Sequence, residues 1–222
     1  MSIETLSLKG VADFAPIVDR CVEALRAGKL AVFPTETVYG LGALASNSAA
    51  IRNLCVQKGR RVGHALPLVI SGADALTRYV PNVDESALRL ARRFWPGPLT
   101  LVLDGSDPKS ELNRLPDESR RAIMPEGTVG IRVPQNDFLL ELLRRLDEPL
   151  ALTSANLTGE SPASNLEEAR EALGTRLDLF VDGGPSKLGR PSTVVKISGA
   201  QRIILREGAI SQNELEEAAT QI

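Results

Sequence analysis

The sequence predicts an α/β fold: a single domain with one twisted, open mixed sheet and flanking helices. Short apolar runs typical of strands alternate with segments whose apolar residues recur at helical spacing, which is the pattern of an α/β domain. Near the end of the chain, strand-like runs follow one another without long helices between them, so part of the sheet is expected to be antiparallel. The length of 222 residues suits one well-buried core and is short for two.

The first half of the chain contains three predicted helices. They run from an Asp13 cap to Ala27, from an Asn47 or Ser48 cap through Cys55, and from Asp84 to Phe94. Gly28 ends the first of them, and the prolines of Trp95–Pro98 forbid continuation of the third. Apolar runs between the helices predict strands at Leu30–Phe33, Leu66–Ile70 and Leu99–Leu103.

The second half opens with a polar stretch, 104–127, which has prolines at 108, 116 and 125 and no clean period. We expect a surface excursion with some helix there, the segment most prone to move, and either a lid or an insertion. Capping signals at Asn136-Asp137, Ser164–Glu167 and Ser211–Glu214 predict three further helices. The remaining apolar runs predict strands at Thr128–Val133, Leu150–Thr153, Leu179–Val181, Thr193–Ile197 and Ile203–Leu205.

Composition sets the class of protein. Hydrophobic residues make up 43% and charged residues 24%, with a net charge of -2, so no overall basic field is available for nucleic acid, although a neutral total leaves room for a local patch. Cys21 and Cys55 lack metal-ligand spacing and are expected to be buried thiols of a reducing compartment. No basic start precedes an apolar run, and nowhere do about 18 apolar residues run together. We therefore expect a cytoplasmic protein that is not in a membrane.

The stretch Pro34–Gly42 is the first candidate site, because it follows a strand and packs two threonine hydroxyls, a carboxylate and a phenol into five residues. Gly40 and Gly42 would let the backbone approach something closely; a plain structural loop is the alternative. Polar residues also follow the ends of other predicted strands, where open α/β sheets bind ligands. These are Ser154, Asn156, Arg132 and Arg206, to which a loop can add Lys58, Arg60 and Arg61.

Convergence of several cations with hydroxyls and an amide suits an anion with several oxygens, and phosphate is the obvious candidate. Any single arginine of this set is more often a solvated surface residue, so only the convergence favours a site. The one histidine, His64, has no apparent acidic partner, which argues against a Ser-His-Asp hydrolase. No Walker-type loop or complete Gly-x-Gly-x-x-Gly motif is present, and no His/Cys/carboxylate cluster predicts a resident metal. A bound nucleotide would bring Mg²⁺ with it.

Seven motifs in order carry a resemblance to a known family. They are Pro34–Gly42, Lys58–Arg60 followed by Pro67-Leu68, Pro96–Thr100, Ile131–Pro134, Thr153–Gly159, Ser192–Val195 and Arg206–Gly208. In this order they resemble the YrdC-like threonylcarbamoyl-AMP synthases of single-domain type, over roughly residues 14–212 of one domain spanning 1–222. Each motif is weak alone, and their order makes the resemblance specific.

The resemblance implies a deep concave site and a nucleotidyltransferase reaction. L-threonine, bicarbonate and ATP would give threonylcarbamoyl-adenylate and pyrophosphate, for N6-threonylcarbamoyladenosine modification at position 37 of tRNA. Partners would include tRNA and the downstream threonylcarbamoyl transferase complex, with Mg²⁺ arriving on ATP.

Site residues follow from the same resemblance. The active-site signature falls on Lys58, Arg60, Ser154 and Asn156, which would also contact the nucleotide. Positions of the threonine pocket match Thr35, Arg132 and Thr153, and positions near the nucleotide match Thr100, Ser192 and Arg206. In this scheme Arg132 holds the threonine carboxylate, and Thr35 or Thr153 recognises the substrate hydroxyl. The family often has proline where this chain has Arg61.

Two other functions remain open. One is an RNA-binding module of the same fold without chemistry, which the near-neutral charge disfavours. The other is a related carbamoyl transfer, as in the similar domain of hydrogenase-maturation proteins, whose zinc-finger and acyl-phosphatase regions have no counterpart in this sequence.

Overall fold

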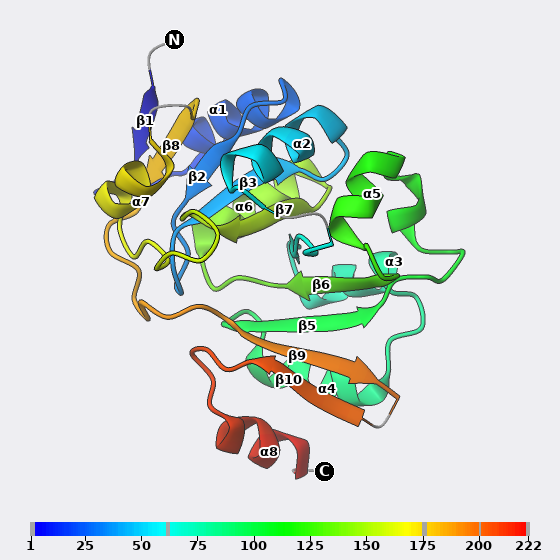
Figure 1. Ribbon diagram of the computed structural model, residues 1–222. Coiled ribbons are helices and arrows are strands. Elements are labelled where there is room, and N and C mark those ends of the chain that lie inside the picture. The colour runs from blue at the N-terminus through cyan, green and yellow to red at the C-terminus, as the bar shows by residue number, and fades with distance from the viewer. Residues whose placement is uncertain (1–2, 61–62, 175–176, 200, 221–222) are drawn as a thin grey trace.

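The computed structural model describes residues 3–60, 63–174, 177–199 and 201–220. Its strands form one sheet in the order β1-β8-β2-β3-β7-β4-β6-β5-β9-β10 (Figure 1). The strands are β1 (Glu4–Ser7), β2 (Ala31–Phe33), β3 (Gly40–Leu44), β4 (Leu68–Val69), β5 (Leu99–Asp104), β6 (Thr128–Arg132), β7 (Leu150–Ser154), β8 (Leu179–Asp182), β9 (Thr193–Ser198) and β10 (Gln201–Arg206).

Pairing within the sheet is mixed, as the sequence predicts. The parallel pairs are β1/β8, β2/β8, β4/β6 and β5/β9, and the other neighbours run antiparallel. The prediction of an α/β fold with one mixed sheet and flanking helices is therefore confirmed.

The helices begin and end close to the predicted positions. They are α1 (Ala15–Arg26), α2 (Ser48–Gln57), α3 (Leu76–Tyr79), α4 (Glu85–Phe94), α5 (Asp117–Ile123), α6 (Asp137–Leu146), α7 (Leu166–Leu173) and α8 (Gln212–Thr220), with 3-10 turns η1 (Ala73–Ala75) and η2 (Glu111–Arg114). The Asn47 and Asn136 side chains accept from the third residue beyond them and cap α2 and α6. Ser211 and Glu214 form the predicted capping box of α8.

Three local predictions need correction. The capping box of α7 lies one residue later than expected, because Asn165 caps the helix and Glu168 reaches back to the Ser164 N–H. The strand expected over Leu66–Ile70 pairs only at Leu68–Val69. Elements β1, β3, η1 and α3 were not predicted at all.

One face of the sheet is covered by α1 and α6, which pack against each other and against β2, β3, β7 and β8 (Figure 1). The apolar faces of α1 and α6 contribute Cys21, Leu25 and Phe138 to this layer. The ring centroids of Phe138 and Phe33 are 6.4 Å apart. Cys21 is a free buried thiol, and burial raises its pKa to about 12; Cys55 is free and half-buried. The expectation of two buried thiols therefore holds fully for Cys21.

The half of the sheet formed by β5, β6 and β9 is covered on one face only. Leu101, Val129 and Ile131 point into the core that α3 and α4 help to close, while the alternate residues Thr100 and Gly130 line a cavity on the opposite face. Since side chains alternate along a strand, one strand supplies both layers. In Figure 1, α3 and α4 lie behind these strands, whose near face carries no helix.

The polar stretch 104–127 folds into η2 and α5 and packs on the body of the protein. Leu112 and Ile123 are buried in the main core. The Ala122 carbonyl accepts a hydrogen bond from the Leu66 N–H, and Arg52 of α2 forms an ion pair with Glu118 at 2.5 Å. This stretch is thus an excursion with some helix, as expected, and it is anchored at several points.

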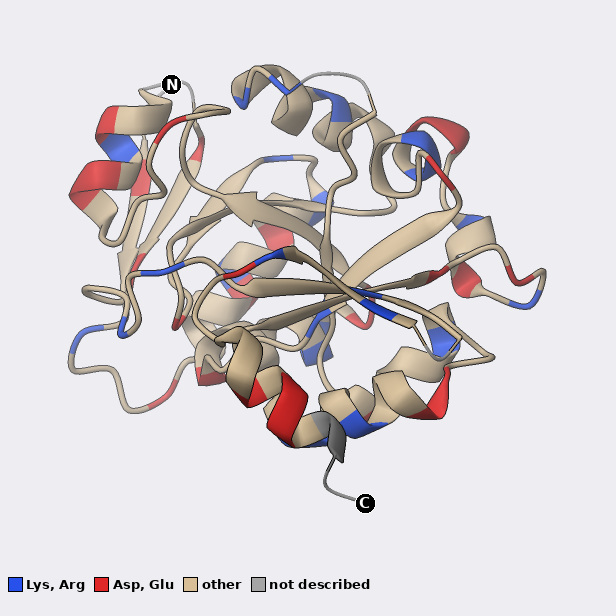
Figure 2. Ribbon diagram, turned by 60° about the horizontal axis from the view of Figure 1, so that its bottom comes forward, with Lys and Arg blue, Asp and Glu red and all other residues tan. Residues whose placement is uncertain are grey.

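Charge is distributed without a dominant sign. Figure 2 shows acidic and basic residues interspersed over the outer helices, with a run of acidic residues on α8. Among the described residues, none of the helices combines the length and the apolar character needed to cross a bilayer.

Candidate active site

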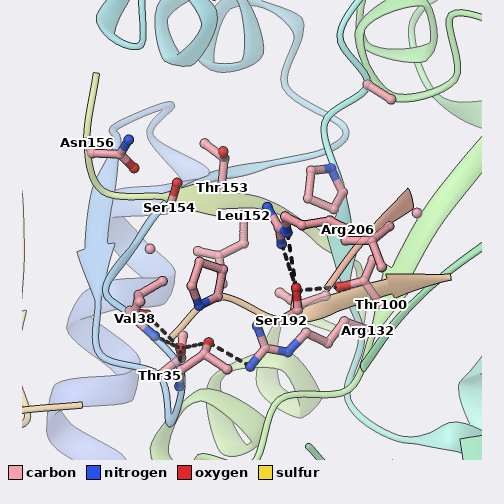
Figure 3. Close-up of a pocket in the computed structure, with 18 of the residues that line it drawn as sticks. Thr35, Val38, Thr100, Arg132, Leu152, Thr153, Ser154, Asn156, Ser192 and Arg206 are labelled. Carbon is pink, nitrogen blue, oxygen red and sulfur yellow. Dashed lines mark hydrogen bonds between the residues drawn. The ribbon is translucent and has the colours of Figure 1, made fainter. Parts of the chain in front are cut away.

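A cavity of about 430 Å³ opens over the uncovered face of the sheet (Figure 3), and every site residue assigned from the family resemblance lines it. The lining comes from the strand ends of β6, β7 and β10, from β5, and from the turns that follow β2 and α2. The predicted residues that it brings together are Thr35, Lys58, Arg60, Thr100, Arg132, Thr153, Ser154, Asn156, Ser192 and Arg206. Segments more than 150 residues apart in the sequence therefore meet at one site, from Thr35 to Arg206.

The turn after β2 is held by its own hydroxyls. The Thr35 hydroxyl donates to the Val38 carbonyl at 2.6 Å and accepts from the Thr37 and Val38 N–H groups, 3.2 and 3.3 Å away. A further contact of 2.8 Å joins the two threonine oxygens, and Thr37 is the donor because the Thr35 proton is already used. The hydrogen-bonding capacity of Thr35 is thus spent inside the turn.

Arg132, at the end of β6, lies against this turn. Its Nη2 donates to Glu36 Oε1 at 2.7 Å and to Thr37 Oγ1 at 2.9 Å, and its Nε donates to the Gly97 carbonyl at 3.1 Å. Both side chains of the Arg132–Glu36 pair are largely buried, 10% and 3% exposed. Because Nη1 takes no part in these bonds, the guanidinium is anchored on one edge while another edge keeps donors for a ligand.

A second polar cluster lies across the cavity. Arg206 of β10 donates from Nε and Nη2 to the Ser192 carbonyl at 3.1 and 2.9 Å, and Ser192 Oγ lies 2.9 Å from Thr100 Oγ1. Burial lowers the pKa of Arg206, and the nearby charge of Arg132 lowers it further. The two guanidinium groups therefore act on each other across the same space, which favours an anion between or beside them.

Lys58 ends helix α2 and is almost fully buried, 3% exposed. Its ammonium donates to the Ser154 carbonyl at 2.7 Å, to the Asn156 carbonyl, and to Asn156 Oδ1 at 3.3 Å. In return the Lys58 carbonyl accepts from the N–H and hydroxyl of Thr158, 3.0 and 2.8 Å away. Burial, with a smaller contribution from Arg60, lowers the pKa of Lys58 to about 8. Lys58 thus ties the end of α2 to the loop after β7.

Arg60 is half-buried at the cavity wall. It donates to the backbone carbonyls of His64 and Ala65, and its Nη1 lies 3.4 Å from Thr153 Oγ1. Burial lowers the pKa of this guanidinium. His64 itself is exposed, as expected for a surface residue. Arg61, the other cation of this loop, lies outside the described residues.

The end of β7 and the loop that follows it present Ser154 and Asn156 to the cavity. The Asn156 side chain donates to the carbonyls of Leu157 at 2.7 Å and Glu160 at 2.8 Å, so its amide is fixed by the loop that it closes. Ser154 continues β7 in register with Gly40 of β3. In Figure 3 both side chains lie on one rim of the cavity, beside Thr153.

The glycines of the opening stretch have a different role from the one expected. Gly40 and Gly42 lie in strand β3, where a Cβ on either would meet the Leu152 side chain of β7 at 2.9 to 3.1 Å. The close approach expected of these glycines is thus made by a neighbouring side chain, and Gly40 also lines the cavity. The Tyr39 hydroxyl is also committed, donating to the Gly184 carbonyl at 2.7 Å.

Sequence reasoning gave no individual role to two residues that support this site. Glu36 and Thr37 belong to the opening stretch, yet their contacts with Arg132 depend on a segment 96 and 95 residues away. The only available signal was a carboxylate next to hydroxyls in a stretch already singled out. Within the described residues, no three His, Cys, Asp or Glu side chains come together in a group that could hold a metal ion.

Comparison with known proteins adds to this geometry. A model of the Sua5/YciO/YrdC family, described as "Telomere recombination", matches residues 23–208. A curated relative from Pyrococcus abyssi, named threonylcarbamoyl-AMP synthase, is 35% identical over 198 residues, which are 89% of this chain and 56% of that protein. The chain thus spans little more than half the length of this relative.

Two solved structures are similar over most of the chain. The crystal structure of P. abyssi Sua5 complexed with L-threonine superposes with a TM-score of 0.86 at 31% identity, covering 100% of this chain and 62% of that one. The crystal structure of Escherichia coli YciO gives a TM-score of 0.79 at 28% identity and covers 93% and 96% of the two chains. The residues that converge on the cavity, the family match and these relatives agree: the chain belongs to the Sua5/YciO/YrdC family.

Proposed function

We propose that this protein is a threonylcarbamoyl-AMP synthase, a nucleotidyltransferase that makes threonylcarbamoyl-adenylate from L-threonine, bicarbonate and ATP. The observation that carries the proposal is that Arg132, Arg60 and Arg206 face one cavity whose rim holds Ser154 and Asn156. A relative of that name and a neighbour in complex with L-threonine support it. Both proteins are longer than this chain, and we propose the activity for the part that this chain shares with them.

The reaction requires crowded anions rather than a strong base. The neutral threonine amine and bicarbonate give a carbamate and water. A carbamate oxygen then forms a bond to the α-phosphorus of ATP, and the bond from that phosphorus to the bridging oxygen breaks, so that pyrophosphate leaves. The nucleophile is already anionic, and catalysis consists of aligning it and stabilising the negative charge around it.

The cavity walls suggest how threonine binds. We assign the threonine carboxylate to the free edge of Arg132, which can give it a charge-assisted hydrogen bond. The substrate hydroxyl is better placed on Thr153, because the hydroxyl of Thr35 is consumed inside its own turn. Thr35 then acts by shaping the turn that supports Arg132.

The remaining cations are assigned to the nucleotide. Arg60 faces the phosphates together with Ser154 and Asn156, and the cluster of Arg206, Ser192 and Thr100 takes the far side of the nucleotide. Lys58 contributes its positive charge and the placement of Asn156, to which it is bonded. Mg²⁺ is part of the substrate, bound to the phosphates of ATP, and neutralises them there.

The product is an activated threonylcarbamoyl group, which suits N6-threonylcarbamoyladenosine formation at position 37 of tRNA by a downstream transferase complex. Cytoplasmic location and contact with tRNA belong to this proposal. A direct test supplies the protein with isotopically labelled bicarbonate, threonine and MgATP. Label should appear in an adenylate that also contains threonine. Pyrophosphate release with no label in an adenylate would contradict the proposal.

A further inference from the structure

Glu36 has a carboxylate that is only half satisfied. The residue is 5% exposed, and its Oε1 accepts from Arg132 Nη2 at 2.7 Å. Its Oε2 is buried and has no hydrogen-bond partner among the described residues. An unpaired buried acceptor destabilises the folded protein. Stability alone therefore does not explain why a carboxylate occupies this position.

The partner of this carboxylate is held tightly. Nη2 of Arg132 is shared between Glu36 and Thr37, and Nε is bound to the Gly97 carbonyl. The acceptors of these three bonds lie in two segments, the turn after β2 and the turn that contains Gly97, and together they fix the plane of the guanidinium. Glu36 itself is kept in place through its carbonyl, which accepts from the Leu188 N–H at 2.8 Å.

Charge is divided unequally over the cavity. Arg132 is paired with a carboxylate, whereas Lys58 donates to backbone and amide oxygens, Arg60 to carbonyls and a hydroxyl, and Arg206 to Ser192. The Arg132 end, with Glu36, is therefore close to electrically neutral, whereas the end that holds the other three cations carries net positive charge, which Glu160 offsets only in part beside Lys58. The near-neutral end suits a ligand with little net charge, and the positive end suits an anion.

We propose that Glu36 is a positioning and specificity-determining residue: it orients Arg132 and cancels its charge, so that this end of the cavity takes a zwitterionic amino acid in preference to a plain anion. The proposal rests on the function assigned above and deepens it. The donors of Arg132 still bind a carboxylate, while the negative charge of Glu36 offsets the repulsion that a lone guanidinium would exert on an ammonium group.

The size of the effect follows from Coulomb's law. A unit charge about 10 Å from a ligand charge, at an effective dielectric constant of about 20, changes binding by roughly tenfold. Glu36→Gln removes the charge and keeps an oxygen that can accept from Arg132. This variant should therefore shift the preference between two ligands that differ in one charge.

The experiment compares threonine with 3-hydroxybutanoate, which is threonine without its ammonium group. Dissociation constants are measured by calorimetry for the wild type, Glu36→Gln and Glu36→Asp. In the wild type threonine should bind more tightly. In Glu36→Gln the ratio of the two constants should move toward 3-hydroxybutanoate by about tenfold or more. Glu36→Asp keeps the charge and should keep the ratio, even if both ligands bind more weakly.

Controls separate this role from a purely structural one. Glu111→Gln changes the carboxylate partner of Arg78, outside the residues that line the cavity, and should leave the ratio unchanged. Affinity for ATP should not fall in Glu36→Gln, because loss of a negative charge cannot weaken the binding of an anion by Coulomb's law. A general loss of structure would weaken all ligands together and would not reverse a preference between two of them.

Two results would overturn the proposal. One is an unchanged ratio in a folded Glu36→Gln that still binds threonine, which would leave the proposed function intact. The other is a wild type that binds 3-hydroxybutanoate more tightly than threonine, and this measurement decides the matter even if Glu36→Gln does not fold. A wild type that binds neither ligand would remove the proposed function as well.

Discussion

Lys58 and Asn156 lie 98 residues apart in the sequence, and the lysine ammonium donates to both the carbonyl and the side-chain Oδ1 of the asparagine. This contact joins the end of α2 to the loop after β7. The motif that contains Lys58 and the motif that contains Asn156 are thus linked directly by hydrogen bonds. Changes in Lys58 should therefore be felt at Asn156.

Lys58 predicts a pH dependence of stability. Its pKa is about 8 in the folded protein, below the ordinary value of 10.5, because the ammonium is buried. Between these values the unfolded chain binds more protons, so the contribution of Lys58 to the free energy of unfolding rises with pH. Below about pH 8 the burial of the charge is a constant cost.

The measurement is urea unfolding of the wild type and Lys58→Met from about pH 7 to pH 10.5. The free energy of unfolding of the wild type minus that of Lys58→Met should increase across this range. Lys187→Met, at an exposed position, serves as the control. A difference that is flat or falls with pH would show that the ammonium is not buried as described.

Arg60→Ala tests the nucleotide end of the cavity. Adenylate formation should fall by about a hundredfold or more, since a preorganised charge at a transition state is worth roughly 2.7–4 kcal/mol. Arg60 also donates to the His64 and Ala65 carbonyls, so we expect a modest loss of about 1–2 kcal/mol in the free energy of unfolding. Arg92→Ala, on the exposed face of α4, is the matched control and should change neither quantity much. Normal adenylation with weakened tRNA binding in Arg60→Ala would instead favour an RNA-binding module.

Arg132→Ala should weaken threonine binding by roughly 10- to 150-fold while ATP binding changes little, because a charged hydrogen bond is worth about 1.5–3 kcal/mol. It should also lower the free energy of unfolding by about 3–5 kcal/mol, since Glu36 is left buried without its partner. The double variant Glu36→Gln/Arg132→Ala removes both charges. It should regain stability and still bind threonine poorly; equal loss of ATP binding would contradict the assignment.

Asn156→Ala tests the loop after β7. The amide makes two hydrogen bonds to loop carbonyls, worth roughly 1–3 kcal/mol together, and one contact with Lys58. We expect slower adenylate formation, by less than in Arg60→Ala, together with faster hydrogen exchange of the 154–160 loop. Full activity with unchanged exchange would show that the amide neither holds the loop nor serves the reaction.

Much of the site could be predicted from the sequence because its residues follow strand ends. Arg132, Ser154 and Arg206 each come at or directly after a short apolar run, where α/β sheets commonly bind ligands. Because β6 and β7 run in opposite directions across β4, Arg132 and Ser154 come together over the face of the sheet rather than at one edge. Capping signals placed α2, α6 and α8 for a local reason, since a cap and its helix are neighbours in the chain.

The rest depends on contacts that no local pattern encodes. The pairing of Glu36 with Arg132 joins positions 96 residues apart. Strand β3 contains Gly40 and Gly42, which have poor strand propensity, and it forms because it pairs with β2 on one side and β7 on the other, with the missing Cβ atoms leaving room for Leu152. Strand β1 is short and half-exposed, and it exists because it adds to β8 at the far edge of the sheet. The hydrogen bonds that the Thr35 hydroxyl makes inside its own turn are likewise not encoded in the sequence pattern.

The central claim is that one cavity joins threonine, bicarbonate and ATP, and pyrophosphate release tests it most directly. Purified protein is supplied with MgATP, bicarbonate and each amino acid in turn, with each component also left out. Pyrophosphate should appear only when threonine and bicarbonate are both present. Equal release without any amino acid would identify plain hydrolysis of ATP to AMP and pyrophosphate, and would contradict the proposed synthase reaction.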